Sequence, residues 1–217
     1  MSEKSYPRDP ADCTRQSSSQ LRSARELAGR LRLRGDETVL VIGAGDGRLA
    51  SSIARLLPRG QVVAIAAAAA RGARARAAFP NRKRPNLRFL MMDPARIVFE
   101  SQFDLVVSDG AGSGESAPPA SLPGAARALK PGGRLFFRMD GEGHLADLLA
   151  AAGETARRRD GPGLRSPSPF PSAAECRGWL AAAGLQPARV EPIPRTERWR
   201  DAPSFASWLR TAGRRYL

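Results

Sequence analysis

Residues 39–50 read VLVIGAGDGRLA, and this stretch decides the fold of the chain. A short apolar run, residues 39–42, breaks into three alternate glycines, Gly43, Gly45 and Gly47, and then resumes with helical spacing. Such a pattern predicts a buried strand, a tight turn and a helix. Glycines in this kind of turn let the backbone approach a ligand closely, and the N–H groups at the helix start favour polar or anionic groups. The stretch therefore predicts a nucleotide-type site.

The spacing of the glycines narrows the choice of cofactor. The dinucleotide fingerprint is Gly-x-Gly-x-x-Gly, whereas here Gly43 and Gly45 are followed by Gly47, and Arg48 stands where the third glycine would be. NAD and FAD are therefore disfavoured. The alternative is a glycine-rich strand-to-helix turn that holds no ligand, although α/β sheets do bind ligands at such turns.

The rest of the chain repeats the alternation of strand and helix. Apolar runs predict further strands at residues 61–65, 87–91, 103–108, 134–139 and, late in the chain, 185–190. Helical spacing predicts helices at residues 21–31, 49–57, 66–79, 124–129, 145–152 and 172–183. Five β–α alternations predict an α/β fold with a doubly wound, mostly parallel sheet that binds ligands at the carboxyl ends of its strands.

We expect one domain in this 217-residue chain. Its parts are an N-terminal helical cap at residues 1–35, a Rossmann-like core at residues 36–153 and a C-terminal region at residues 154–217 with a connection, a helix and the last strands. The start of that region, residues 155–171, is rich in Arg, Gly and Pro, which indicates an exposed connection.

Composition limits the location and the chemistry of the protein. No apolar run reaches the roughly 20 residues that span a bilayer, and the start of the chain lacks a secretory signal, so we expect a cytoplasmic protein with no membrane association. Cys13 and Cys176 have no metal-ligand spacing, and His144 is the only histidine. We therefore expect no metal site, and no Ser-His-Asp triad is favoured.

The strong positive charge does not by itself indicate a nucleic-acid partner. The formal net charge is +14 and the pI is near 11.4, but almost all basic residues are arginines spread along an alanine-rich chain, as a GC-rich coding sequence produces. Aromatic residues interleaved with basic ones, which would stack on bases, are scarce. Nucleic acid is therefore an unlikely partner on this evidence, and a small-molecule substrate or a protein partner is expected.

Motifs along nearly the whole chain resemble the trans-aconitate methyltransferase-like branch of the class I S-adenosylmethionine-dependent methyltransferases. The resemblance rests on short motifs in the expected order, Asp9-Pro10-Ala11-Asp12, Leu33-Arg34-Gly35-Asp36-Glu37, Gly45-Asp46-Gly47, Pro85-Asn86-Leu87-Arg88-Phe89 and Leu129-Lys130-Pro131-Gly132-Gly133-Arg134. It implies a Rossmann-like, seven-stranded sheet, S-adenosylmethionine as the cofactor and methylation of a small molecule, with a carboxylate oxygen as the suggested acceptor.

The resemblance also places the cofactor site. It assigns cofactor-binding positions to Gly43, Ala44, Gly45, Asp46 and Gly47 in the turn, to Gln20 before the first helix, to Ala66 after the second strand and to Asp93 after the third, where the family has a residue near the adenine amino group. Asp46 has an alternative interpretation, an Asx turn that only holds the loop, and Asp93 has one as the end of a strand. No catalytic residue is assigned.

The chain departs from the family where the family does its chemistry. The acidic residue that bonds the ribose hydroxyls in the family is Ala66 here, an aspartate usual in the first strand is Val41, and Ala44 replaces a common cysteine. Hydrogen bonds to charged groups contribute about 1.5–3 kcal/mol, so losing the ribose carboxylate would weaken binding by roughly tenfold to a hundredfold. Two hypotheses follow: an active methyltransferase, or a degenerate protein of this fold that no longer binds the cofactor and serves as a binding or partner protein.

Two polar residues lie close to the predicted acceptor side. Asp109 follows the fourth strand, and a solvated loop aspartate is the favoured interpretation. Arg138, in the fifth strand, could hold an anionic substrate with two parallel hydrogen bonds, but the favoured interpretation is that it only follows the strand pattern.

Overall fold

The computed structural model describes residues 25–67, 69–80, 83–109, 118–158, 170–194, 196 and 198–210. The chain divides into two compact units, Met1–Met139 and Asp140–Leu217. The first contains the sheet, and the described part of the second contains helices. The single domain expected from the sequence remains a prediction. No helix among the described residues is long and apolar enough to cross a membrane.

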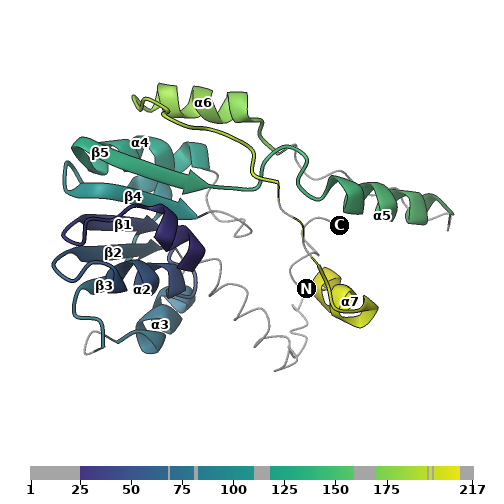
Figure 1. Ribbon diagram of the computed structural model, residues 1–217, viewed down its shortest axis with the longest axis horizontal. Coiled ribbons are helices and arrows are strands. Elements are labelled where there is room, and N and C mark those ends of the chain that lie inside the picture. The colour runs from purple at the N-terminus through teal and green to yellow at the C-terminus, as the bar shows by residue number, and fades with distance from the viewer. Residues whose placement is uncertain are drawn as a thin grey trace. The chain divides into compact units, whose positions relative to one another are not determined.

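A parallel sheet of five strands forms the centre of the first unit (Figure 1). The strands are β1 (Thr38–Ile42), β2 (Gln61–Ala66), β3 (Leu87–Met91), β4 (Phe103–Asp109) and β5 (Leu129–Arg138), in the spatial order β3-β2-β1-β4-β5. The chain builds outward from β1 to β3 and then crosses back to β4 on the other side of β1. This topology confirms the predicted doubly wound α/β fold, whose ligands bind where the strand order reverses, between β1 and β4.

Helices cover both faces of the sheet (Figure 1). Helices α2 (Arg48–Arg55) and α3 (Ala69–Ala78) pack on one face, where Val41 of β1, Ile53 of α2 and Ala64 of β2 belong to one fully buried cluster. Helix α4 (Pro118–Ala128) packs on β4 and β5 and on the short 3₁₀ helix η1 (Pro94–Arg96). The continuous apolar character of β1 follows from this burial on both faces.

The second unit contains helices α5 (Ala146–Arg158), α6 (Ala173–Ala182) and α7 (Ala202–Arg210). Helix α6 begins with a capping box, in which Ser172 accepts from the amide of Glu175 and the Glu175 carboxylate accepts from the Ser172 amide. The ring of Trp199, just before α7, packs with those of Phe205 and Trp208 in α7, and the ring centroids lie 4.9–6.1 Å apart.

One predicted strand is wrong. Residues 185–190 form no strand, because Pro187 lacks an N–H group for a sheet ladder and Pro192 and Pro194 follow closely. The predicted count of seven strands is therefore not confirmed by the described residues, which contain five.

Several boundaries also differ from the prediction. Strand β5 begins at Leu129, before the Lys130-Pro131-Gly132-Gly133 sequence that was expected to precede it, and the register with β4 shifts there. Helix α5 runs to Arg158, six residues beyond its predicted end. Glu154, Ala156, Arg157 and Arg158 favour this extension as good helix formers, and Glu154 and Arg158 form an ion pair one helical turn apart.

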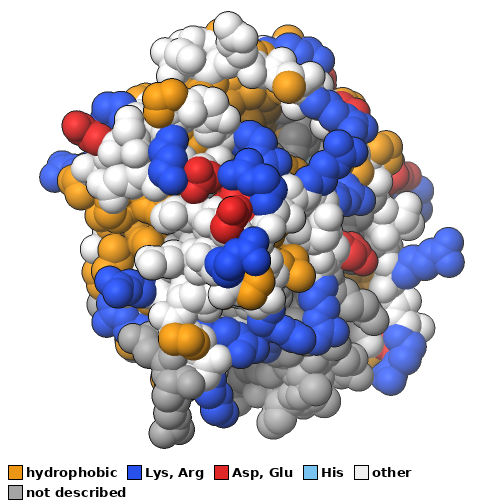
Figure 2. Space-filling view, turned by 60° about the vertical axis from the view of Figure 1, so that its left-hand side comes forward, with side chains coloured by type: hydrophobic (Ala, Val, Ile, Leu, Met, Phe, Trp, Pro, Cys, Tyr) orange, Lys and Arg blue, Asp and Glu red, His pale blue; other side chains and the backbone are white. Residues whose placement is uncertain are grey.

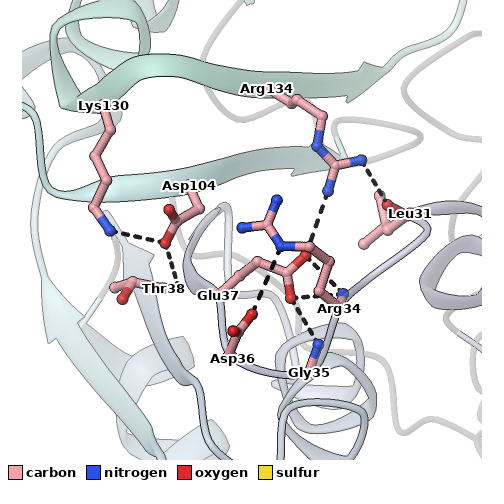
Figure 3. Close-up of polar contacts among 9 residues, drawn as sticks. All are labelled: Leu31, Arg34, Gly35, Asp36, Glu37, Thr38, Asp104, Lys130 and Arg134. Atoms are coloured by element: carbon pink, nitrogen blue, oxygen red, sulfur yellow. Dashed lines mark hydrogen bonds and ion pairs between the residues drawn. The ribbon is translucent and has the colours of Figure 1, made fainter.

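Two carboxylates hold the edge of the sheet at the amino ends of its strands (Figure 3). Glu37 is 1% exposed, and its oxygens accept from the amides of Arg34 at 2.8 Å and Gly35 at 2.9 Å. Asp104 accepts from the amide of Thr38 at 2.8 Å and from Lys130 Nζ at 2.9 Å. Asp104 therefore joins the starts of β1, β4 and β5.

The environment of Asp104 also sets its titration. Burial raises the pKa of Asp104, but the hydrogen bonds from Thr38 and Lys130 lower it by more, so the pKa lies below its ordinary value. A carboxylate with a depressed pKa in the folded state contributes stability above its unfolded pKa, and this stability is lost as the pH falls through the folded value.

We predict that Asp104→Asn lowers the free energy of unfolding by about 1–2 kcal/mol at pH 6, and that the deficit shrinks as the pH falls below about 4. Urea denaturation of the unmodified protein and of Asp104→Asn at pH 6 and pH 3.5 measures this difference in the free energy of unfolding. The control is Asp36→Asn, which removes an exposed carboxylate of the same edge that lies 3.7 Å from Arg34 and should change stability by less than about 0.5 kcal/mol. An unchanged deficit at pH 3.5 would contradict the assignment.

Candidate functional site

The turn after β1 has the left-handed backbone that its glycines allow. Gly43, Gly45 and Gly47 have φ angles of +77°, +54° and +83°, all in the left-handed region that residues with a Cβ rarely adopt. The amides of Gly43 and Ala44 donate to the carbonyl of Ile65 at 3.1 and 2.8 Å. The turn is thereby held against the carboxyl end of β2.

The three glycines have two different surroundings. A Cβ on Gly43 would meet nothing within 4 Å, and one on Gly45 would meet only the carbonyl of Gly43 at 3.8 Å. A Cβ on the buried Gly47 would lie 3.0 Å from atoms of both Phe79 and Phe89. Gly43 and Gly45 are exposed and leave space for a ligand to approach the backbone, whereas Gly47 lets α2 pack closely against its neighbours.

Asp46 holds the turn. Its Oδ1 accepts from the amide of Arg48 at 3.0 Å, and its Oδ2 lies 2.9 Å from Arg48 Nε. The first contact is the Asx-type bond that the sequence offered as the alternative to a cofactor contact. The side chain is 48% exposed, so a ligand above the turn would still face this carboxylate.

The position expected to hold the ribose is apolar. Ala66 ends β2 and is 5% exposed, and its Cβ lies 3.9 Å from the point where a Cβ on the helical residue Gly72 would stand. Val41 and Ala44 are 0% and 5% exposed. Among the predicted cofactor residues, Ala44 and Ala66 thus offer no polar side-chain group. At Val41 and Ala66, where the family has acidic residues, this chain has no carboxylate.

Asp93 lies at the carboxyl end of β3. It is exposed and is the N-cap of η1, where its Oδ1 accepts from the amide of Ala95 at 2.9 Å. The end-of-strand role is therefore present, and the exposed carboxylate remains accessible to a ligand. Gln20, the remaining predicted position, lies outside the described residues.

An ion pair that the sequence did not predict lies at the same edge. Asp109 ends β4 and Arg138 ends β5, and Arg138 donates through Nε to Oδ1 at 2.9 Å and through Nη2 to Oδ2 at 2.7 Å. Asp109 is therefore not a solvated loop residue. The sequence contains a signal for this ion pair, because two residues of opposite charge at the ends of adjacent parallel strands lie side by side.

His144 belongs to the second unit. Its Nδ1 is 3.7 Å from Asp140 Oδ1, and its ring packs edge-on against Phe170 at 4.9 Å. Burial raises the pKa of the Cys176 thiol in the same unit. The described residues contain no group of three or more His, Cys, Asp or Glu side chains placed to hold a metal ion.

The parallel sheet brings the predicted positions to one edge. Gly43, Gly45 and Asp46 follow β1, Ala66 ends β2 and Asp93 follows β3, so all lie at the carboxyl ends of the strands. The open turn fits a nucleotide-type group, since its backbone is free of side chains there. The end of β2 does not supply the ribose contact that the resemblance implies.

Comparison with known proteins identifies this architecture. Residues 39–133, which contain β1, the turn and the start of β5, match a family described as a methyltransferase domain. The sheet has the class I methyltransferase fold.

Solved structures share the methyltransferase fold at low sequence identity. A chain in the complex between the Haloferax volcanii Trm112 methyltransferase activator and the putative methyltransferase is 22% identical, with a TM-score of 0.61 and 96% of each chain covered. A SAM-dependent methyltransferase from Aquifex aeolicus is 19% identical (TM-score 0.59; 84% of this chain and 92% of that one). The YcgJ protein from Bacillus subtilis is 21% identical (0.57; 75% and 67%). No curated protein matches the chain.

We predict that Gly47→Ala destabilises the first unit more than Gly45→Ala does. Both variants force a Cβ into a left-handed backbone, which costs about 1–2 kcal/mol, but only Gly47→Ala also pushes a Cβ against Phe79 and Phe89. Urea denaturation of both variants measures the difference. Equal losses of stability would show that the third glycine is not a packing position.

Proposed function

We propose that the chain is an S-adenosylmethionine-dependent methyltransferase that acts on a small molecule. The observation that carries the proposal is the open turn after β1, where Gly43 and Gly45 are exposed and have room around their Cα atoms. This turn stands at the β1/β4 switch of a methyltransferase fold. A ligand there would lie against bare backbone and close to the start of α2.

The residues at this edge have separate roles in the proposal. Gly43 and Gly45 let the cofactor approach the backbone, and Asp46 keeps the turn closed through its bonds to Arg48. Asp93 offers an exposed carboxylate at the end of β3 for the adenine side. When bound, S-adenosylmethionine supplies a methyl group on an activated sulfonium.

A carboxylate oxygen is the acceptor we propose. Transfer to a carboxylate relies on positioning, because an ionised acceptor needs no general base, and the described edge of the first unit has no histidine to act as one. Arg138 does not offer the edge formed by Nε and Nη2 to such an acceptor, since both atoms already bind Asp109. In this proposal the Asp109–Arg138 pair keeps the ends of β4 and β5 in place.

A second function is supported by a specific observation. The acidic residue that bonds the ribose in the family and the aspartate usual in its first strand are replaced by the buried, apolar Ala66 and Val41. These replacements favour a degenerate methyltransferase-fold protein that acts through a protein partner. That one similar chain was solved in a complex with a methyltransferase activator is consistent with such a role.

Calorimetric titration with S-adenosylmethionine and S-adenosylhomocysteine separates the two functions. We expect the unmodified protein to bind both in the micromolar range. Ala66→Asp should bind roughly tenfold to a hundredfold more tightly, because it restores a charged hydrogen-bond acceptor at the end of β2. Ala67→Asp, which places the same charge on the exposed neighbouring residue, is the matched control and should bind like the unmodified protein.

Two other outcomes of the titration would change the proposal. If neither the unmodified protein nor Ala66→Asp binds, while thermal unfolding shows both to be folded, the methyltransferase proposal fails and the partner-protein function stands. Binding by Ala66→Asp alone would show a site that is intact except for its ribose anchor.

A further inference from the structure

The charges are not spread evenly along the chain. Between Asp46 and Asp93 there is no acidic residue. The same segment contains nine arginines and one lysine, namely Arg48, Arg55, Arg59, Arg71, Arg74, Arg76, Lys83, Arg84, Arg88 and Arg82. The overall net charge does not reveal this excess of basic over acidic residues, which falls in the segment that forms α2, β2, α3 and β3.

These elements form one end of the sheet, and one side chain ties their connecting loops together. Asn86, just before β3, donates through Nδ2 to the carbonyls of Ala54 and Leu57 at 2.9 and 2.8 Å and to that of Gly60 at 3.4 Å. The end of α2, the loop before β2 and the loop before β3 are thereby held against one another.

Basic side chains border this junction. Arg55 and Arg59 lie at the end of α2 and in the loop that follows, Lys83 and Arg84 lie in the loop before β3, and Arg88 lies in β3. We name these five residues the basic flank. All are exposed except the half-buried Arg84, and no ion pair joins any of them to a carboxylate in the part of the chain that the structure describes. Figure 2, turned so that the left-hand side of Figure 1 comes forward, shows Lys and Arg side chains over much of the surface, with Asp and Glu side chains among them.

We infer that the basic flank binds the phosphate backbone of a nucleic acid. Four of its five residues are arginines, whose planar guanidinium matches a phosphate with two parallel hydrogen bonds. Exposed cations that no carboxylate neutralises, as Arg55, Arg59, Lys83 and Arg88 are among the described residues, keep their attraction for a polyanion and release its counterions on binding. The inference does not depend on the proposed methyl transfer, since the basic flank involves none of the cofactor residues.

The contacts of the basic flank are with phosphates and not with bases. The aromatic residues of the segment, Phe79 and Phe89, are half-buried and buried against Gly47, so they offer no stacking platform. Binding is therefore sequence-independent. An acidic protein is the less favoured partner, because protein interfaces have an apolar centre. Of the large exposed apolar side chains, only Leu56 is a sequence neighbour of a flank residue, and Leu90 and Met91 lie at the end of β3.

The test measures binding of fluorescent, random-sequence 20-base-pair DNA and RNA duplexes and of poly-glutamate by anisotropy, from 50 to 300 mM salt. We expect dissociation constants of about 1–100 µM for both duplexes at physiological salt. The flank variant replaces Arg55, Arg59, Lys83 and Arg88 with Gln. It should bind DNA more than about tenfold more weakly and reduce the salt slope by up to about 3.6, at about 0.9 for each lost phosphate contact.

A matched control removes the same charge elsewhere. Replacing the exposed Arg157, Arg158, Arg198 and Arg210 with Gln should leave the affinity within about threefold and the slope nearly unchanged, because these residues lie outside the basic flank. Equal losses in both variants would overturn the inference in favour of general charge attraction. Absence of duplex binding, or poly-glutamate binding as tight as that of the duplexes, would also overturn it.

Discussion

The burial of β1 is the constraint on which the rest of the structure depends. Val39, Leu40 and Val41 are fully buried, and the strand is hydrogen-bonded to β2 on one side and to β4 on the other. A central strand of this kind has no exposed edge or face, so polar chemistry is confined to its two ends. At the amino end Glu37 accepts backbone amides, and at the carboxyl end the glycine turn opens. The fold and the candidate site therefore share one cause.

The main architecture could be predicted from the sequence because buried parallel strands leave a strong signal. The apolar runs at β1 to β4 and the glycine turn were enough to predict the α/β fold. Residues 185–190 include apolar side chains typical of a strand but form none, since Pro187 and the prolines that follow lack the N–H donors that a sheet needs. The early start of β5 was missed because Pro131 and two glycines suggest a turn, and only the pairing with β4 shows a strand with an irregular register.

The candidate site was predicted less completely, for a different reason. The residue types of the turn were readable, but their surroundings were not: Gly47 packs against Phe79 and Phe89, whereas Gly43 and Gly45 stand open. The Asp109–Arg138 pair joins two strands that are distant in the sequence and adjacent in the sheet. The basic flank likewise emerges only when Asn86 brings separate loops together. In each case, tertiary contacts decide what a residue of known type does.

The central claim is that the turn at the end of β1 holds the cofactor although the ribose carboxylate is absent. Amide chemical shifts report this directly, because Gly43 and Gly45 have backbone N–H groups beside the proposed ligand. In a titration of the ¹⁵N-labelled protein with S-adenosylhomocysteine, we predict that the signals of Gly43, Gly45 and Asp46 move together and saturate, with smaller changes at Asp93. Unchanged signals for these glycines at saturating ligand, or changes confined to residues 140–210, would contradict the account.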